Sequence, residues 1–228
     1  MIRNFVDWEM KTPMIERMAE FFDARAEGYE AHMMENVVGA DEYYRVTAEC
    51  FPAREKMNLL DLGCGTGLEL DELFPRLPDM KVTGVDMSGN MLDILRRKHP
   101  DRDMTLIQGD YFTAELPAGG FDAAVAVQTM HHFRDDEKIR LYRRILGFLK
   151  PGGMYIETDY TAVDEAEEER MLSEADRLLR EGGEKNILYH IDIPFTSEHQ
   201  ARLLTEAGFR EVQVVWHKAN TAIMTARK

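Results

Sequence analysis

Three glycines carry the clearest chemical signal in this sequence. Gly63, Gly65 and Gly67 alternate with small residues directly after the apolar run 58–62, and a helical pattern begins at Leu68. A strand that turns sharply into a helix, with its backbone close to a ligand, needs residues without a Cβ at the turn. The spacing is G-x-G-x-G rather than the G-x-G-x-x-G of dinucleotide sites. We therefore predict a cofactor-binding turn at this point.

An acidic residue follows at the distance that such a site requires. Asp86 ends the short apolar stretch 81–86, about twenty residues after the glycines, where a nucleotide-binding βαβ unit places the carboxylate that accepts ribose hydroxyls. Ser88 is a suitable N-cap for the next helix. Met87 and Met91 would then flank an adenine ring. A solvated turn acid and ordinary core methionines are the alternative interpretation of these residues.

Three more segments continue the alternation of strands and helices. The segments 104–112 and 121–133 each begin as an apolar strand, and 141–157 contains a helix, a Pro-Gly-Gly turn and another strand. This alternation predicts a parallel sheet covered on both faces. Polar or aromatic side chains follow the strands: Asp110, Tyr111, Gln128, His131 and His132.

In this order, the motifs resemble the class I S-adenosylmethionine-dependent methyltransferases. Residues 58–67 are similar to motif I of that family, 86–92 to its D-x-S-x-x-M-L segment, and 149–153 to its L-K-P-G-G turn. The resemblance implies an α/β fold, with a doubly wound, mostly parallel seven-stranded sheet of the Rossmann-like methyltransferase type. A C-terminal antiparallel hairpin and a helical cap complete the expected architecture.

The expected organisation is one methyltransferase domain over residues 1–228. We divide it into a helical cap (1–50), a cofactor-binding core (51–159), a lid insertion (160–195) and a C-terminal helix with hairpin (196–228). Outside the core the sequence predicts helices within 13–50, an amphipathic helix over 163–180, a helix over 197–207 capped by Thr196 and ended by Gly208, and strands over 210–216 and 221–226.

The resemblance also implies the cofactor, S-adenosylmethionine, and its contacts. By this resemblance, Asp110 forms a hydrogen bond with the adenine amino group and Tyr111 stacks on the adenine ring. Arg25 pairs with the methionine carboxylate. A helix packing face explains Tyr29 almost as well as a position at the methyl-transfer site. The full expected set of cofactor-binding residues is Arg25, Tyr29, Asp61, Gly63, Cys64, Gly65, Asp86, Met87, Met91, Asp110, Tyr111 and Gln128, with Cys64 as a small packing residue.

The implied reaction is an in-line attack on the sulfonium methyl, for which the protein mainly holds donor and acceptor in position. The expected catalytic residues are His131, His132 and Tyr29, because a histidine titrating near neutral pH is a suitable general base. A structural or cofactor-shaping role is the alternative for the two histidines. Glu157 and Asp159 are further candidate bases, or ligands for a substrate amine.

The predicted activity is methyl transfer to a small molecule. The alternatives are a non-catalytic protein that binds S-adenosylmethionine, a dinucleotide-dependent oxidoreductase, and an enzyme that uses a modified cofactor such as a carboxylated form, which needs an added cation. The acceptor, and the choice among O-, N-, S- and C-methylation, stay open, because one scaffold of this kind hosts many substrates.

Composition and cysteine content agree with this interpretation. The formal charge of −14 over 228 residues argues against a nucleic-acid partner. The two cysteines, Cys50 and Cys64, form no disulfide framework, which indicates a reducing compartment. Neither a long apolar span nor a signal peptide is evident, so we expect a soluble, cytoplasmic protein without a membrane partner. A homodimer is compatible with the sequence, and the oligomeric state stays open.

No metal site is predicted. His190, Asp192 and His199 lie within ten residues of one another, and a metal bound by these three is an open alternative. His-x-Asp has no recognised ligand spacing, so a substrate-contacting loop or a helix entry is the favoured interpretation.

Overall fold

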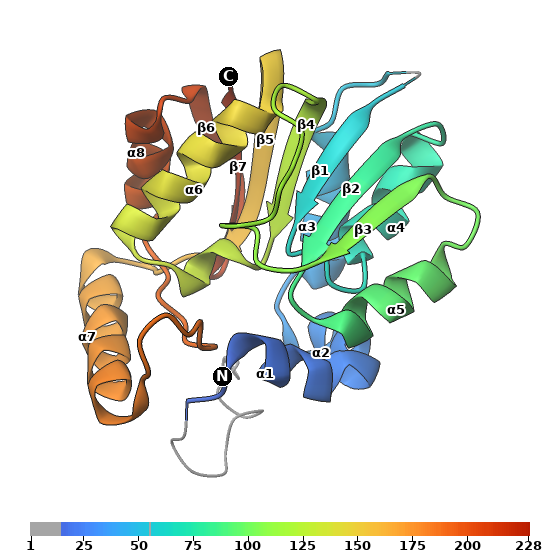
Figure 1. The fold of residues 1–228 in the computed structure, drawn as a ribbon. Helices are drawn as coiled ribbons and strands as arrows, with labels where there is room; N and C mark the ends of the chain where they lie inside the picture. Colours follow the sequence, from blue (N-terminus) through green and yellow to red (C-terminus); the bar gives the residue numbers. More distant parts are fainter. Residues whose placement is uncertain (1–14, 55) are drawn as a thin grey trace.

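The protein is described here by a computed structural model of residues 15–54 and 56–228. In this part of the chain, seven strands form one sheet in the order β3-β2-β1-β4-β5-β7-β6 (Figure 1). All neighbours from β3 to β5 are parallel, whereas β7 is antiparallel to both β5 and β6. The predicted doubly wound sheet with its terminal hairpin is thus confirmed. The strands are β1 (Asn58–Leu62), β2 (Lys81–Asp86), β3 (Met104–Gln108), β4 (Phe121–Val127), β5 (Leu149–Tyr160), β6 (Arg210–Lys218) and β7 (Thr221–Arg227).

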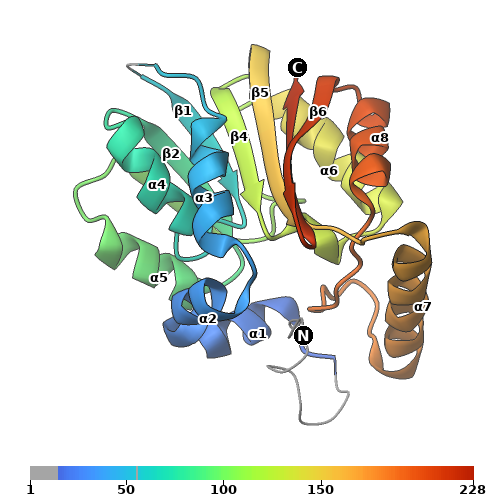
Figure 2. The same cartoon turned by 180° about the vertical axis from the view of Figure 1, so that it is seen from behind.

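Helices cover both faces of the sheet. Figures 1 and 2 show α6 and α8 on one face and α3 and α4 on the other, and α5 packs with the latter pair. Each face has its own apolar core. The helices are α1 (Met18–Arg25), α2 (Tyr29–Asn36), α3 (Ala40–Glu49), α4 (Leu68–Arg76), α5 (Gly89–Lys98), α6 (Asp135–Phe148), α7 (Glu165–Gly182) and α8 (Ser197–Ala207), with the short 3₁₀ turns η2 (Ala26–Gly28) and η3 (Met130–His132).

The helices α1, α2 and α7 lie beyond the carboxyl ends of the central strands (Figures 1 and 2). A short antiparallel bridge ties α1 to the segment that follows α7: the Met18 N–H donates to the Leu188 carbonyl, and the His190 N–H donates to the Glu16 carbonyl. The segments before β1 and after β5 therefore meet over the same end of the sheet. The four-part division of the chain stays a prediction, and residues 1–14 of the expected cap lie outside the described residues.

The predicted helix caps are present. The Ser88 hydroxyl accepts the Met91 N–H at 3.1 Å at the start of α5, and Thr196 accepts the His199 N–H at 3.2 Å at the start of α8. Gly208, with φ +112°, ends α8. Such local signals predict well because a cap satisfies backbone groups of its own helix.

Three boundaries differ from the sequence-based expectation. The helix α6 ends at Phe148, and β5 begins directly at Leu149, so the Pro-Gly-Gly turn lies inside the strand instead of before it. The hairpin strands extend to Lys218 and Arg227. In α7 only Ala175 is fully buried, and the rest of its apolar stripe is half-buried, as suits a helix at the periphery.

Two broader expectations can be compared with the fold. Cys50 and Cys64 are both free thiols. Among the described residues, none of the helices combines the length and apolarity needed to cross a bilayer.

Candidate functional site

The turn from β1 to α4 is built by three glycines with left-handed backbone angles. Gly63, Gly65 and Gly67 have φ values of +71°, +46° and +77°. A Cβ on Gly63 would lie 2.6 Å from Thr129 Oγ1, and one on Gly67 would lie 2.5 Å from Leu95 Cδ1. Packing therefore requires glycine at both positions. Over Gly65, by contrast, no atom lies within 4 Å of the Cβ position, so the backbone there is accessible to a ligand.

Asp86 is fixed beside this open backbone. Its Oδ2 accepts the Gly65 N–H and its Oδ1 accepts the Ser88 N–H, both at 2.8 Å. An ionised carboxylate offers about four acceptor positions, so each oxygen can accept one further hydrogen bond. Burial raises the pKa of Asp86 to about 6. The carboxylate is thus oriented to accept two neighbouring hydroxyls, such as those of a ribose.

Two buried carboxyl groups lie next to the same turn without donors. Asp61 is 1% exposed, and neither of its carboxyl oxygens has a hydrogen-bond partner; Oε1 of Glu69 also has none. Burial raises the pKa of Asp61 to about 7, and burial together with Asp61 raises that of Glu69. Buried polar groups are nearly always hydrogen-bonded, so this pair has the character of a binding site for a cationic donor such as an amino group.

Gln128 and Tyr43 are two further residues with unpartnered buried groups. Gln128, just after β4, has φ +52°, and its N–H donates to the Thr158 carbonyl. Both atoms of its side-chain amide are buried without partners, as is the Tyr43 hydroxyl. A non-glycine residue in the left-handed region is uncommon and is often found at functional sites. Gln128 thus lies where it was expected, at the strand end.

The other residues expected near the adenosine have ordinary packing. Met91 is buried and Met87 half-buried. Cys64 Sγ lies 2.7 Å from where a Cβ of Gly84 would be, which agrees with its expected role as a small packing residue. Asp110 accepts the N–H of Phe112 at 2.8 Å.

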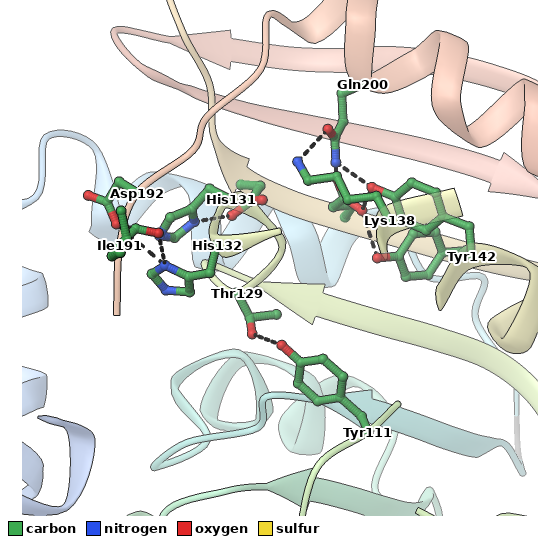
Figure 3. Close-up of polar contacts among 12 residues, drawn as sticks. Tyr111, Thr129, His131, His132, Lys138, Tyr142, Ile191, Asp192 and Gln200 are labelled. Carbon is green, nitrogen blue, oxygen red and sulfur yellow. Dashed lines mark hydrogen bonds and ion pairs between the residues drawn. The ribbon is translucent and has the colours of Figure 1, made fainter. Parts of the chain in front are cut away.

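Tyr111 lies in the core. Its hydroxyl is 2.9 Å from Thr129 Oγ1 (Figure 3), and its ring packs against Phe112 and Phe133. This hydrogen bond connects the segment after β3 to Thr129, the residue that packs against Gly63. Stacking of Tyr111 on an adenine stays a prediction.

Arg25 and Tyr29 lie on the helical segment over the strand ends. The Arg25 guanidinium donates to both carboxylate oxygens of Glu16, at 3.1 and 2.8 Å, and lies 3.7 Å above the Phe21 ring. Tyr29 is half-buried and contacts Phe22 edge to face. The proposed pairing of Arg25 with a methionine carboxylate stays a prediction, and it requires exchange of Glu16 for the ligand.

His131 and His132 form a buried pair at η3. Nδ1 of His131 lies 2.7 Å from Asp159 Oδ1. Burial lowers the pKa of His131, but the charge of Asp159 and this hydrogen bond raise it above its ordinary value on balance. Burial and the neighbouring His131 and His190 hold the pKa of His132 well below its ordinary value. His132 is therefore neutral at physiological pH.

The three residues considered as metal ligands are not brought together. His199 Nδ1 pairs with Glu168 Oε1 at 2.6 Å and its Nε2 lies 3.2 Å from Asp135 Oδ2, at the contact of α6, α7 and α8. His190 stacks on the Phe21 ring, with centroids 3.6 Å apart. Asp192 instead approaches His131 and His132, as Figure 3 shows.

A family model described as a methyltransferase domain matches residues 59–153, which contain the glycine turn, Asp86 and Gln128. Over these residues the chain is similar to the class I S-adenosylmethionine-dependent methyltransferases, so the resemblance of the sequence motifs is confirmed.

Individual relatives of this chain differ in their named activities. The carboxy-S-adenosyl-L-methionine synthase of Campylobacter hominis is 26% identical over 82% of this chain and 86% of its own length. The demethylmenaquinone methyltransferase of Symbiobacterium thermophilum is 33% identical over 60% of this chain and 56% of its own. The solved structure of human N-acetylserotonin methyltransferase in complex with SAM matches with a TM-score of 0.62 and 23% identity, over 92% of this chain and 59% of that one. The chain thus spans less than two thirds of the latter two proteins, and the structural match shows the fold.

Two residues of the candidate site, Glu69 and Tyr43, were not predicted from the sequence. Glu69 follows the glycine turn in the first turn of α4, where an acid is expected simply from the helix dipole. Tyr43 lies on a helix whose apolar pattern suggests only packing. Asp192 was considered from the sequence only together with His190 and His199, and no local spacing signals its contact with His131.

Glu157, considered as an alternative base, is held in a buried hydrogen-bond network. It accepts hydrogen bonds from the hydroxyls of Tyr142 at 2.9 Å and Tyr155 at 2.7 Å, and from Gln200. Gln200 also accepts the Lys138 ammonium at 2.7 Å (Figure 3). This network joins β5, α6 and α8, so Glu157 contributes to packing between these elements.

Proposed function

We propose that this methyltransferase transfers a methyl group from S-adenosylmethionine to a small-molecule acceptor by in-line displacement. The observation that carries the proposal is the accessible backbone at Gly65 next to a doubly anchored Asp86. The unpartnered carboxyl groups of Asp61 and Glu69 add a place for an amino group. Together they match the ribose and the methionine ammonium of one ligand.

The roles of the chain's own residues follow from their chemistry. Asp86 accepts the ribose hydroxyls, Asp61 and Glu69 accept the ammonium, and Gly65 permits close approach of the backbone. When bound, S-adenosylmethionine supplies the methyl group already activated on a sulfonium. The protein therefore contributes positioning and exclusion of water more than bond chemistry.

The acceptor side of the proposed site is formed by the histidine pair. Asp159 orients His131 through its Nδ1 proton. Nε2 of the neutral His132 is buried without a partner, so it can accept a proton from an acceptor hydroxyl or amine. The charge of −14 favours a small acceptor over a polyanion such as nucleic acid.

Calorimetric titration with S-adenosylmethionine, S-adenosylhomocysteine and NAD tests the proposed cofactor. Any ligand that co-purifies is first identified after denaturing a sample. We expect micromolar binding of the first two and none of NAD. Binding of NAD alone would make the glycine turn a dinucleotide site. Turnover with candidate acceptors then distinguishes an enzyme from a protein that only binds the cofactor.

Asp86→Ala is expected to weaken S-adenosylhomocysteine binding by about 10- to 100-fold, because a buried charged acceptor pair for the ribose is lost. Calorimetry on the folded variant measures the effect. The exposed Asp101→Ala, which removes the same charge nearby in the chain, is expected to bind like the unaltered protein. Equal affinities for both variants would refute the ribose role.

The same affinity is expected to depend on pH. The pKa of Asp86 is raised to about 6, and only its ionised form can accept both hydroxyls. Binding of S-adenosylhomocysteine therefore weakens as the pH falls through 6, by at most about tenfold per pH unit from this group. In Asp86→Ala this part of the pH dependence should disappear, which a titration series in matched buffers can show.

A second candidate is chemistry on the cofactor itself. The similarity to the carboxy-S-adenosyl-L-methionine synthase extends over 82% of this chain, which is more than for the methyltransferase of Symbiobacterium thermophilum. The mass of the nucleoside recovered after incubation with S-adenosylmethionine and candidate carboxylic acids distinguishes the two. A heavier, carboxylated nucleoside would favour this candidate, whereas the demethylated product favours methyl transfer.

A further inference from the structure

Three side chains from two separate segments converge beside β4 and β5 in an arrangement that their own hydrogen bonds do not explain. His131 and His132 come from η3, and Asp192 from the segment between α7 and α8. Asp192 Oδ1 lies 3.6 Å from His131 Nε2 and 3.5 Å from His132 Nδ1 (Figure 3). The side chains of both histidines are at most 3% exposed, and that of Asp192 is 15% exposed.

These separations are too long for hydrogen bonds, which lie near 2.7–3.2 Å between nitrogen and oxygen. Oδ1 of Asp192 accordingly is a buried atom without a hydrogen-bond partner. The buried ammonium of Lys138 does not compensate it, because it donates to Gln200. Asp192 is therefore an acceptor placed between two ring nitrogens without a donor for its oxygen.

The same separations suit a shared metal ion. Ligands about 2.1 Å from a tetrahedral ion are about 3.4 Å apart from one another. Two imidazoles with one carboxylate are a donor set for Zn²⁺ and Fe²⁺ sites that keep open coordination positions.

The protonation pattern of His131 agrees with this role. Its Nδ1 is engaged by Asp159 at 2.7 Å, which places the proton on Nδ1 and leaves the Nε2 lone pair toward Asp192. A carboxylate on the outer nitrogen is the usual support of a metal-binding histidine. For His132 the requirement is specific: its Nδ1 also lies 3.2 Å from the Ile191 carbonyl, so metal binding needs the tautomer with the proton on Nε2. In that tautomer His132 cannot act as the base, and the ion takes over the activation of the acceptor.

We propose that His131 Nε2, His132 Nδ1 and Asp192 Oδ1 bind one divalent transition-metal ion, with Asp159 as a positioning residue, and that the open positions of the ion take a hydroxyl oxygen of the methyl acceptor. The second half of this inference rests on the proposed function and narrows it to oxygen acceptors. An acceptor hydroxyl bound to the ion loses its proton more readily. Its oxygen then forms the bond to the methyl carbon as the carbon–sulfur bond breaks, leaving a neutral thioether and releasing the proton to solvent.

The test uses the full chain, stripped with a chelator and dialysed. Zn²⁺ and Co²⁺ are titrated by calorimetry, and Co²⁺ is also followed through its visible d–d bands. Asp192→Asn, His131→Gln and Asp159→Asn are compared with His199→Gln, which alters a different histidine beside two carboxylates. Binding of S-adenosylhomocysteine is measured on every sample, and circular dichroism reports folding.

One equivalent of metal is expected for the unaltered protein and for His199→Gln. Asp192→Asn and His131→Gln should bind at least about 100-fold more weakly, and Asp159→Asn about 10- to 100-fold more weakly. If His131→Gln does not fold, the metal affinity of the isosteric Asp192→Asn tests the proposed site.

Absence of stoichiometric metal binding, or equal affinity in Asp192→Asn, overturns the metal site. In that case a proton held on His131 between Asp159 and Asp192 explains the cluster. Retained S-adenosylhomocysteine binding would then leave the proposed function intact. If the unaltered protein binds the metal but does not bind S-adenosylhomocysteine, the proposed function is refuted, and the acceptor role of the ion is refuted with it.

Discussion

Gly65→Val is expected to reduce binding of S-adenosylhomocysteine by about 100-fold or more while leaving the protein folded. The space at the Cβ position of Gly65 is open, with no atom within 4 Å, so the Cβ of the new side chain meets no atom of the protein. It would occupy the region through which the adenosine must approach the backbone. Calorimetry measures the affinity, and urea unfolding measures the stability.

Gly152→Val is the matched control. Gly152 has φ +75° and also no atom within 4 Å of its Cβ position. It lies near the amino end of β5, whereas the site lies at the carboxyl ends of the parallel strands. Each substitution places a side chain in the left-handed region, which costs about 1–2 kcal/mol. If both variants lose similar stability but only Gly65→Val loses affinity, the loss of affinity is due to the side chain blocking the ligand. If both variants bind alike, the accessible backbone at Gly65 is not the cofactor site.

The parts of the fold that the sequence predicts well are those with local causes. The glycine turn requires positive φ and close packing at three positions, and the caps at Ser88 and Thr196 satisfy the N–H groups of their own helices. The alternation of buried strands with amphipathic helices then leaves few arrangements besides a doubly wound sheet. The two strands of the C-terminal hairpin were also predicted from their residues, whereas their place at an antiparallel edge of the sheet was expected from the family resemblance.

The parts that the sequence did not predict depend on contacts between distant segments. His199 was grouped with Asp192 because they are close in the chain, but α8 carries it to Glu168 and Asp135. Asp192 packs against η3 because the segment after α7 returns over the sheet, and Arg25 meets Glu16 through the chain that precedes α1. In each case a charged side chain found its partner through tertiary packing, which spacing along the sequence does not encode.

Asp61→Asn is expected to stabilise the ligand-free protein and to weaken cofactor binding. Burial raises the pKa of Asp61 to about 7 from an ordinary value of 3.8, with a further contribution from Asp86. Between these two values the folded state holds a proton that the unfolded state has released, so the free energy of unfolding falls as the pH rises from about 4 to 7. Above pH 7 the folded protein carries the penalty of a buried carboxylate, which the neighbouring Glu69 carboxyl reduces only in part.

The amide removes that penalty, because it needs no ionisation and its NH₂ can donate to Glu69. We expect a gain in the free energy of unfolding of about 2–4 kcal/mol above pH 7, which shrinks towards zero as the pH falls to about 4. Binding of S-adenosylhomocysteine should weaken by about 1.5–3 kcal/mol, since the charged acceptor for the ammonium is gone. Urea unfolding at several pH values and calorimetry give the two quantities.

A rise in stability together with a loss of affinity is the informative result, because a substitution that merely damages the fold lowers both. The exposed Asp79→Asn changes the net charge equally and is expected to alter neither quantity by more than about 0.5 kcal/mol. If Asp61→Asn is less stable than the unaltered protein above pH 7, the carboxylate has a donor in the folded protein. If affinity is unchanged, the ammonium is held elsewhere, and Asp61 is a structural residue of the β1 strand. Both expected changes together would mean that this chain maintains a destabilising buried carboxylate because the cofactor needs it.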